Sequence, residues 1–269
     1  MVSLFDVIKR LEKIAPPSLA YKGDVIGLQI GPSLLSEQKK IEVEKIMVTL
    51  DPTYDAMVEA ARKKINLVIT HHSLFPKPTS HVSDVYLETL RVALRYKIGL
   101  YVVHTNWDAV EGGVSDTLAE VLELDVIDTL PASYGSDVIP LGRVCMVRRK
   151  LNLSIFLQFI MQKLNTNCIR YVGKLDEEVK CVAVAGGLGV NEDMLMKAKE
   201  KNVDTYVTGD FHHRDALLAK TLGIKLIGAT HYATEIVGMK RLFYILQLEL
   251  PEVEICYYDP GPPWNEYHK

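Results

Sequence analysis

The ten residues Leu67–Pro76, LVITHHSLFP, run from four apolar or β-branched residues into two adjacent histidines and end in a proline. Residues 67–70 have the composition of a β-strand that is covered on both faces, as in a parallel sheet. Pro76 forbids the continuation of regular structure. His71 and His72 are therefore expected at the carboxyl end of a buried strand, where open α/β sheets place their ligands. Taken alone, the pair is also compatible with one solvated histidine and one hydrogen-bonded in a turn.

The composition is that of an ordinary globular protein, with 48% hydrophobic and 24% charged residues among 269, enough for one large domain or two smaller ones. A net charge of −3 disfavours nucleic acid as a partner. The basic run 148–150, Arg-Arg-Lys, is interpreted as solvated. The four cysteines are widely spaced, which predicts reduced, packed thiols in a cytoplasmic protein.

Neither a membrane span nor a signal peptide is expected. No apolar run approaches the length of a membrane-spanning helix. In the N-terminal segment, Leu4, Phe5, Ile8 and Leu11 share one helical face, and charged residues interrupt the apolar pattern. The segment is therefore predicted to be a docked amphipathic helix, and no membrane partner is expected.

Strand-like and helix-like segments alternate along the chain, which predicts an α/β fold. An imperfect internal repeat is visible: residues 45–70 and residues 180–208 each have the order strand, helix, strand. The repeat continues, because residues 100–108 match residues 225–235 to within a residue or two. We therefore predict two pseudo-repeated α/β lobes that face each other across a cleft.

The boundary between the lobes is predicted from residues 130–140, which contain Pro131, Gly135 and Pro140 and form the best linker candidate. The first lobe is then residues 1–130, completed by residues 225–269. The second lobe is residues 131–224.

Imidazole and carboxylate side chains follow several of the predicted strands, and together they suit zinc, iron or manganese. Neighbouring residues at a strand end point in different directions, so adjacent histidines would each serve one of two ions. A His and a Glu four residues apart on a first helical turn project from one face. A structural alternative for Asp108 is to cap the helix that begins after Gly112-Gly113. The six candidates are His71, His72, His104, Asp108, His231 and Glu235.

Two further segments follow strands. Gly186–Gly189, GGLG, could bring backbone N–H groups to a phosphate, but it lacks the complete phosphate-binding motifs and a tight turn is favoured. Residues 209–214 hold His212, His213 and Arg214 at the position equivalent to the His71-His72 pair. These side chains could bind an anion or pass protons, or could form a solvated helix start.

Three separated blocks resemble the NIF-three-like family, whose members are often called type 2 GTP cyclohydrolase homologues. The blocks are ITHHSLF (69–75), HTNWDAVEGGVSDTLAEVLEL (104–124) and GATHYATE (228–235), preceded by DVIGLQIG (24–31). Their order and spread make the resemblance cover most of the chain. One departure is Gly23-Asp24-Val25, where family members often have Trp-Asp-Asn.

The resemblance implies two interlinked α/β lobes with a dinuclear metal site in the cleft between them, and assembly into a toroidal homo-hexamer. It implies two divalent transition-metal ions, with His104 beside them in the His-Thr-Asn element. The ligands that it implies are His71, His72, Asp108, His231 and Glu235.

Two functions are consistent with these observations. The first is a metal-dependent hydrolase acting on a small nucleotide-like or phosphorylated metabolite, with a GTP cyclohydrolase-like reaction implied by the resemblance alone. In this hypothesis His104 or His213 carries the proton. The second is a hexameric adaptor in which metals hold the lobes together for protein or nucleic-acid partners. We favour the enzyme, because the candidate polar groups outnumber those that a structural staple needs.

Overall fold

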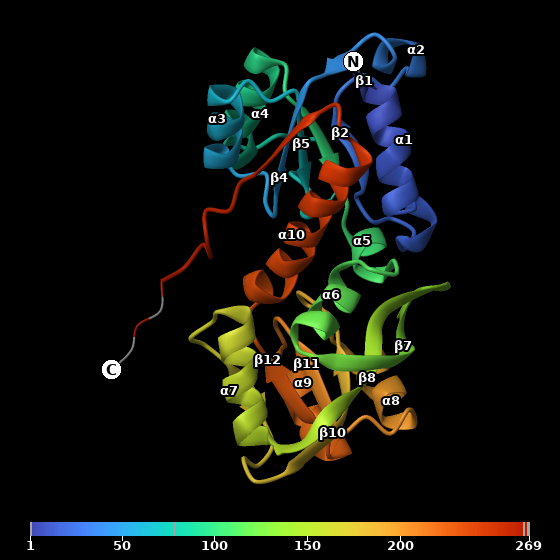
Figure 1. Ribbon diagram of the computed structural model, residues 1–269, viewed down its shortest axis with the longest axis vertical. Helices are drawn as coiled ribbons and strands as arrows, with labels where there is room; N and C mark the ends of the chain where they lie inside the picture. The colour runs from blue at the N-terminus through green and yellow to red at the C-terminus, as the bar shows by residue number, and fades with distance from the viewer. Residues whose placement is uncertain (1, 78, 266, 268–269) are drawn as a thin grey trace. The chain divides into compact units, whose positions relative to one another are not determined.

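The computed structural model (Figure 1) describes residues 2–77, 79–265 and 267, and the chain divides into two compact units. Unit 1 is Met1–Trp107 with Met239–Pro260, and unit 2 is Asp108–Gly238 with Gly261–Lys269. These bounds differ from the predicted lobes 1–130 with 225–269 and 131–224. In both divisions, residues late in the chain complete the first unit.

Unit 1 is built on a five-stranded sheet in the order β13-β4-β5-β6-β2. Its centre is three parallel strands, β4 (Lys45–Thr49), β5 (Leu67–Thr70) and β6 (Gly99–Val102), connected by α3 (Tyr54–Arg62) and α4 (Asp84–Tyr96). All four residues of β5 are buried, as the stretch LVIT predicts. The carboxyl ends of these strands lie at one edge of the sheet, so the residues that follow them are brought together.

The sheet of unit 1 is completed by segments from both ends of the chain. β2 (Gly27–Ile30) pairs antiparallel with β6, and β13 (Glu254–Tyr257) pairs parallel with β4. The strand β13, near the end of the chain, thus completes the sheet of unit 1. The N-terminal helix α1 (Leu4–Ile14) buries four residues, whereas the predicted face member Phe5 is only half-buried. The remaining short elements are β1 (Val2–Ser3), η1 (Pro17–Leu19), α2 (Leu35–Gln38) and β3 (Glu42–Val43).

Unit 2 repeats the pattern around a six-stranded sheet in the order β7-β8-β10-β11-β12-β9. Its parallel strands are β10 (Glu178–Val184), β11 (Thr205–Thr208) and β12 (Lys225–Gly228), connected by α8 (Glu192–Glu200) and α9 (His213–Leu222). The β-α-β-α-β repeat expected from the sequence is therefore present in both units, and the α/β fold class is confirmed.

The predicted linker at residues 130–140 is a β-hairpin, not a connection between lobes. It joins β7 (Leu124–Tyr134) to β8 (Asp137–Asn152), with Gly135 in the turn at φ +62°. Pro131 lies where the register of the two strands shifts, and β7 is an edge strand. Proline is tolerated at bulges and on edge strands, so prolines and glycine punctuate a hairpin here. The other elements of unit 2 are α6 (Val114–Val121), α7 (Leu153–Leu164) and β9 (Arg170–Val172).

Two helices contribute residues to both units. α5 (Thr105–Ala109) carries the change from unit 1 to unit 2, which falls between Trp107 and Asp108. α10 (His231–Glu249) begins in unit 2, and its residues from Met239 onward belong to unit 1. Among the described residues, none of the helices is long and apolar enough to cross a membrane.

The buried residue Arg143 donates hydrogen bonds to the chain segments around α5 and α6. The Arg143 side chain is 5% exposed, and its Nε and Nη2 donate to the two carboxylate oxygens of Asp116 at 2.7 and 2.8 Å. Nη2 also donates to the carbonyls of Ala109 and Val110, directly after Asp108. Nη1 donates to the carbonyl of Pro140 at 2.7 Å. Arg143 therefore fixes the backbone that carries Asp108.

We expect Arg143→Ala to lower the free energy of unfolding of unit 2 by about 3–5 kcal/mol, because it leaves a part-buried carboxylate and several carbonyls without their donor. The matched control is Arg148→Ala, which removes an exposed arginine from a pair with Asp125 on the same strand and should cost under about 1 kcal/mol. Urea unfolding followed by circular dichroism and amide hydrogen exchange measures both. Equal losses in the two variants would contradict this role for Arg143.

Candidate metal centre

Three histidines lie together in unit 1. His71 and His72 directly follow β5, and His104 follows the neighbouring parallel strand β6. The ring centroid of His71 lies 5.1 Å from those of His72 and His104, and the His72–His104 distance is 5.9 Å. One ring nitrogen from each lies within 4.8 Å of those of the other two, close enough to hold a metal ion. The expected convergence at the strand ends is therefore observed for these three residues.

Each of these imidazoles has an oxygen acceptor at Nδ1. The acceptor is the Val103 carbonyl for His71 at 2.9 Å, Asp51 Oδ1 for His72 at 2.7 Å, and Asp24 Oδ1 for His104 at 2.8 Å. Carbonyl and carboxylate oxygens only accept, so Nδ1 carries the proton and donates it. The lone pair of a neutral ring then lies on Nε2. An imidazole anchored by oxygen at one nitrogen is the usual arrangement of a metal-ligating histidine.

Asp24 explains the first part of the DVIGLQIG block. Its side chain is 4% exposed, and its Oδ2 accepts hydrogen bonds from the backbone N–H and the hydroxyl of Thr105. Burial raises the pKa of Asp24, but hydrogen bonds and charge attraction from His104, with the hydrogen bonds from Thr105, outweigh burial and leave the pKa below its ordinary value. Asp24 is therefore a carboxylate that orients His104.

Gln29 explains the second part of that block. Its Oε1 accepts a 2.9 Å hydrogen bond from the backbone N–H of Leu74, in the loop that follows the paired histidines. The block thus supports both histidine elements of unit 1 from β2 and the loop before it. In the departing triplet, Val25 donates its backbone N–H to Asp24 Oδ1 at 2.8 Å, so the Asp remains anchored although its neighbours differ from the family pattern.

In unit 2, His231 and Glu235 form a second pair on the first turn of α10. His231 Nδ1 donates to Asp210 Oδ2 at 3.0 Å, while Nε2 lies 3.1 Å from Glu235 Oε1. With Nδ1 donating to Asp210, a neutral ring would turn its Nε2 lone pair toward the carboxylate. The close approach is favourable only when a proton or a cation lies between Nε2 and Oε1. His231 and Glu235 therefore share one face of α10, as predicted, and Nε2 of the histidine faces Oε1 of the glutamate.

The glycine-rich loop after β10 makes room for this pair. Gly187 has φ +57°, and a Cβ there would lie 2.0 Å from Glu235 Oε1. Its N–H donates to Thr234 Oγ1, and its carbonyl accepts from the backbone N–H groups of Gly209 and Asp210. The segment Gly186–Gly189 is therefore a tight turn against α10, as favoured over phosphate binding. The glycine is needed because the carboxylate occupies the space of a side chain.

Asp108 lies within α5 and is 9% exposed. The capping alternative does not hold, because the N-cap of α6 is Gly113. Arg143 holds the two carbonyls that follow Asp108, as described above. The position of this carboxylate is thus set by buried structure and not by a helix-capping role.

His213, predicted as a proton carrier, is the exposed first residue of α9. His212 is the N-cap of that helix and reaches Asp215, so the segment forms a helix start. His213 belongs to neither histidine group described above, and its catalytic role stays a prediction.

Besides Asp24, two further carboxylates that touch the histidines were not among the predicted site residues. Asp51 follows β4, and Asp210 follows β11. Each has the same signal that singled out the histidines, a polar residue at the carboxyl end of a predicted strand. Which imidazole each one contacts depends on the register of parallel strands, which a single sequence does not encode locally.

The donor atoms fit a transition metal. Three imidazoles in unit 1 and an imidazole with a carboxylate in unit 2 are the nitrogen and oxygen ligands that zinc, iron and manganese share. Each imidazole is anchored through Nδ1, so Nε2 is the donor that a metal would use. Clusters that could hold a metal ion are therefore present.

The chain is similar to known proteins over nearly its whole length. The family described as Duf34/NIF3 (NGG1p interacting factor 3) matches residues 2–262. The chain belongs to this family. A Methanocaldococcus jannaschii relative named "GTP cyclohydrolase 1 type 2 homolog" is 32% identical over 94% of this chain and 98% of its own length. A relative of the same name from Methanothermobacter thermautotrophicus is 32% identical over 99% of this chain and 97% of its own.

Solved structures of the family have the same fold. A Bacillus cereus protein related to NIF3 superposes with a TM-score of 0.87 at 23% identity, over 99% of both chains. Reduced HcgD from Methanocaldococcus jannaschii superposes with a TM-score of 0.79 at 30% identity, over 96% of this chain and 98% of its own. The resemblance to the NIF-three-like family is thus confirmed over nearly the whole chain.

We expect Gly187→Ala to displace the Glu235 carboxylate, because the new Cβ would occupy the position of its Oε1. The matched control is Gly135→Ala, whose φ of +62° is similar but whose Cβ would meet nothing within 4 Å. In both variants the free energy of unfolding should fall by about 1–2 kcal/mol, because a residue with a Cβ is strained in the left-handed backbone conformation. Only Gly187→Ala should also shift the NMR signals of the His231 ring and weaken zinc binding. Matching ring signals and zinc affinities in the two variants would contradict this role of Gly187.

Proposed function

We propose that this family member is a metal-dependent hydrolase that uses two divalent transition-metal ions, namely zinc, iron or manganese. The observation that carries the proposal is the common orientation of four imidazoles, each with Nδ1 on an oxygen acceptor. Structural histidines have no need for this uniform presentation of Nε2. The proposed metal ligands are His71, His72, Asp108, His231 and Glu235.

Two divalent ions bound by these residues would acidify a water molecule and stabilise negative charge that develops on the substrate. The chain's own residues would position and transfer the proton. His104 donates its Nδ1–H to the carboxylate of buried Asp24, which fixes this tautomer. The same carboxylate would stabilise the imidazolium that forms when Nε2 accepts a proton. We assign proton transfer to His104, and His213 remains a second candidate from the sequence. Since one nitrogen of His104 lies near those of His71 and His72, metal analysis of His104 variants would separate transfer from ligation.

The proposed substrate is a small nucleotide-like or phosphorylated metabolite. The name shared by the curated relatives, GTP cyclohydrolase 1 type 2 homolog, supports a nucleotide and a ring-opening hydrolysis. A hydrolase of this type would place its acidified water against an electrophilic ring carbon. The identity of the substrate rests on resemblance, and the test below therefore begins with a panel of metabolites.

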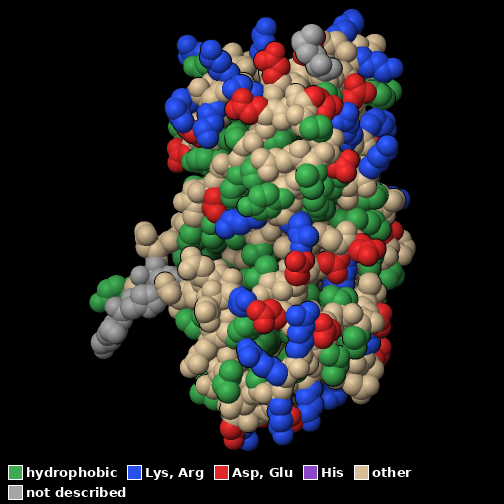
Figure 2. Space-filling model, viewed as in Figure 1, with side chains coloured by type: hydrophobic (Ala, Val, Ile, Leu, Met, Phe, Trp, Pro, Cys, Tyr) green, Lys and Arg blue, Asp and Glu red, His purple; other side chains and the backbone are tan. Residues whose placement is uncertain are grey.

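Cytoplasmic location and assembly into a homo-hexamer are proposed with the function, on the basis of composition and family resemblance. Nucleic acid is not the proposed partner, because the net charge is −3. On the face shown in Figure 2, basic and acidic side chains are intermixed and form no broad basic patch. The proposed partners are therefore the substrate and further copies of this chain.

We expect the purified protein to hold close to two transition-metal ions per chain, and Glu235→Ala to lose more metal than His212→Ala. Glu235 is buried beside the anchored His231, whereas His212 is an exposed helix N-cap. Removing a ligand should release an ion, and removing the exposed imidazole should not. Elemental analysis of both variants after the same purification measures this. Equal metal content in the two variants would contradict the assignment of Glu235 as a metal ligand.

We expect Asp108→Asn to abolish hydrolysis while it preserves the fold. The substitution keeps the shape of the side chain but removes a negative charge from a site proposed to hold about four positive charges, so at least one ion should bind more weakly. The measurement is turnover on a substrate found in the metabolite panel, with the melting temperature in matched metal. If the protein is instead a hexameric adaptor in which metal holds the lobes together, the substitution should lower the melting temperature, and no substrate should be turned over by either protein. Unchanged turnover would contradict the hydrolase mechanism.

A further inference from the structure

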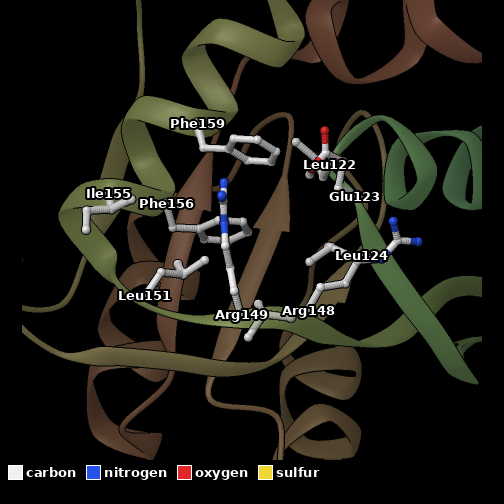
Figure 3. A pocket seen from close by; sticks show the side chains of 10 residues that line it. Leu122, Glu123, Leu124, Arg148, Arg149, Leu151, Ile155, Phe156 and Phe159 are labelled. Atoms are coloured by element: carbon white, nitrogen blue, oxygen red, sulfur yellow. The ribbon is translucent and has the colours of Figure 1, made fainter.

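Unit 2 contains a cavity that is separate from the candidate metal residues. It has a volume of about 110 Å³ and lies between the hairpin strands β7 and β8 and the helix α7. Side chains from all three elements and from the turn before β7 line it (Figure 3). Its apolar surface is formed mainly by Leu122, Leu124, Leu151, Phe156 and Phe159. Three of these five, Leu122, Leu124 and Phe156, are buried parts of the core of unit 2, so the cavity is an opening onto that core.

The basic run 148–150 was interpreted from the sequence as solvated. Its three side chains have different partners at this cavity. Residues 147–150 lie where the register between β8 and β10 shifts, so regular alternation of side chains does not apply to them, and Arg148 and Arg149 both line the cavity. Arg148 pairs with Asp125 at 2.9 Å, and Lys150 lies 3.6 Å from Glu178. Figure 3 shows Arg149 extending past Phe156 toward Phe159, while Arg148, which also lines the cavity, points in a different direction. Its guanidinium carbon is 5.8 Å from the Phe159 ring centroid.

The charges around the cavity leave one cation in excess. Arg148 is neutralised by Asp125, and Lys163 is neutralised by Glu123. Within the described ranges, no carboxylate lies within ion-pair distance of Arg149. Its guanidinium is held beside an aromatic ring at the mouth of an apolar cavity, where it keeps its planar set of donors.

We propose that this cavity binds a small amphipathic monoanion, specifically a carboxylate that carries an aromatic or short aliphatic group. The carboxylate accepts paired hydrogen bonds from Arg149, a geometry that the guanidinium matches better than an ammonium does. The apolar group lies on the leucine and phenylalanine side chains. The cavity is small, so only a compact apolar group fits in it, and the excess of one cation selects a single negative charge. The proposal does not depend on the hydrolase function.

The test uses three ligands with one framework: 4-phenylbutyrate, the uncharged 4-phenylbutan-1-ol and the cationic 4-phenylbutylamine. Each is titrated into the full-length protein by isothermal titration calorimetry. Chemical shifts of the Leu124, Leu151 and Ile155 methyl groups locate the binding. We expect the acid to bind at this cavity about tenfold more tightly than the alcohol or more, because a hydrogen bond to a charged partner is lost in the alcohol. The amine should bind least.

Arg149→Ala should weaken the acid about tenfold or more and leave the alcohol unchanged. Arg148→Ala is the matched control, since it removes the neighbouring arginine, which is already paired with Asp125, and it should weaken the acid far less than Arg149→Ala does. Circular dichroism confirms that both variants remain folded. The proposal is overturned if the acid fails to bind, if acid and alcohol bind equally, if the methyl shifts fall elsewhere, or if the two arginine variants weaken the acid to the same extent.

Discussion

The hydrogen bond at Nδ1 of each histidine is the constraint on which the candidate centre depends. An imidazole can rotate about its side chain and exchange its proton between two nitrogens, so a histidine at a strand end has no fixed donor. Asp24, Asp51 and Asp210 and one backbone carbonyl remove both freedoms. The rings then present Nε2 without further ordering, and less conformational entropy is lost when a ligand binds. A centre without these anchors would contain the same histidines with several competing geometries.

The α/β fold supplies these anchors because its strands end at one edge. In unit 1, β4, β5 and β6 are adjacent and parallel, so Asp51, His72 and His104 follow neighbouring strand ends although they are far apart in sequence. In unit 2, β11 and β12 are related in the same way, and Asp210 meets His231. The internal repeat is therefore more than a repetition of secondary structure. Each unit uses one strand to carry an imidazole and the strand beside it to carry the carboxylate that orients it.

Much of this architecture could be predicted from local sequence, and the failures have a physical cause. The buried strand before His71 and the shared helical face of His231 and Glu235 follow from side-chain periodicity, which acts over a few residues. The hairpin at Gly135 was predicted to be a linker, because proline and glycine mark bulges, turns and linkers alike. Asp51 was not assigned to the site, because strand register connects it to His72 across 21 residues. Local patterns identify the elements, whereas register decides which side chains meet.

Two residues that are not candidate metal ligands also determine the geometry of the candidate centre. Gly187 donates no side chain, yet its missing Cβ gives the Glu235 carboxylate its place. Arg143 lies 34 and 33 residues after Ala109 and Val110, and it donates hydrogen bonds to these two carbonyls, which directly follow Asp108. A sequence that kept every imidazole and carboxylate but altered these two positions would retain the composition of the centre and lose its geometry. The geometry of the candidate centre is therefore determined by packing around its imidazoles and carboxylates as well as by those side chains themselves.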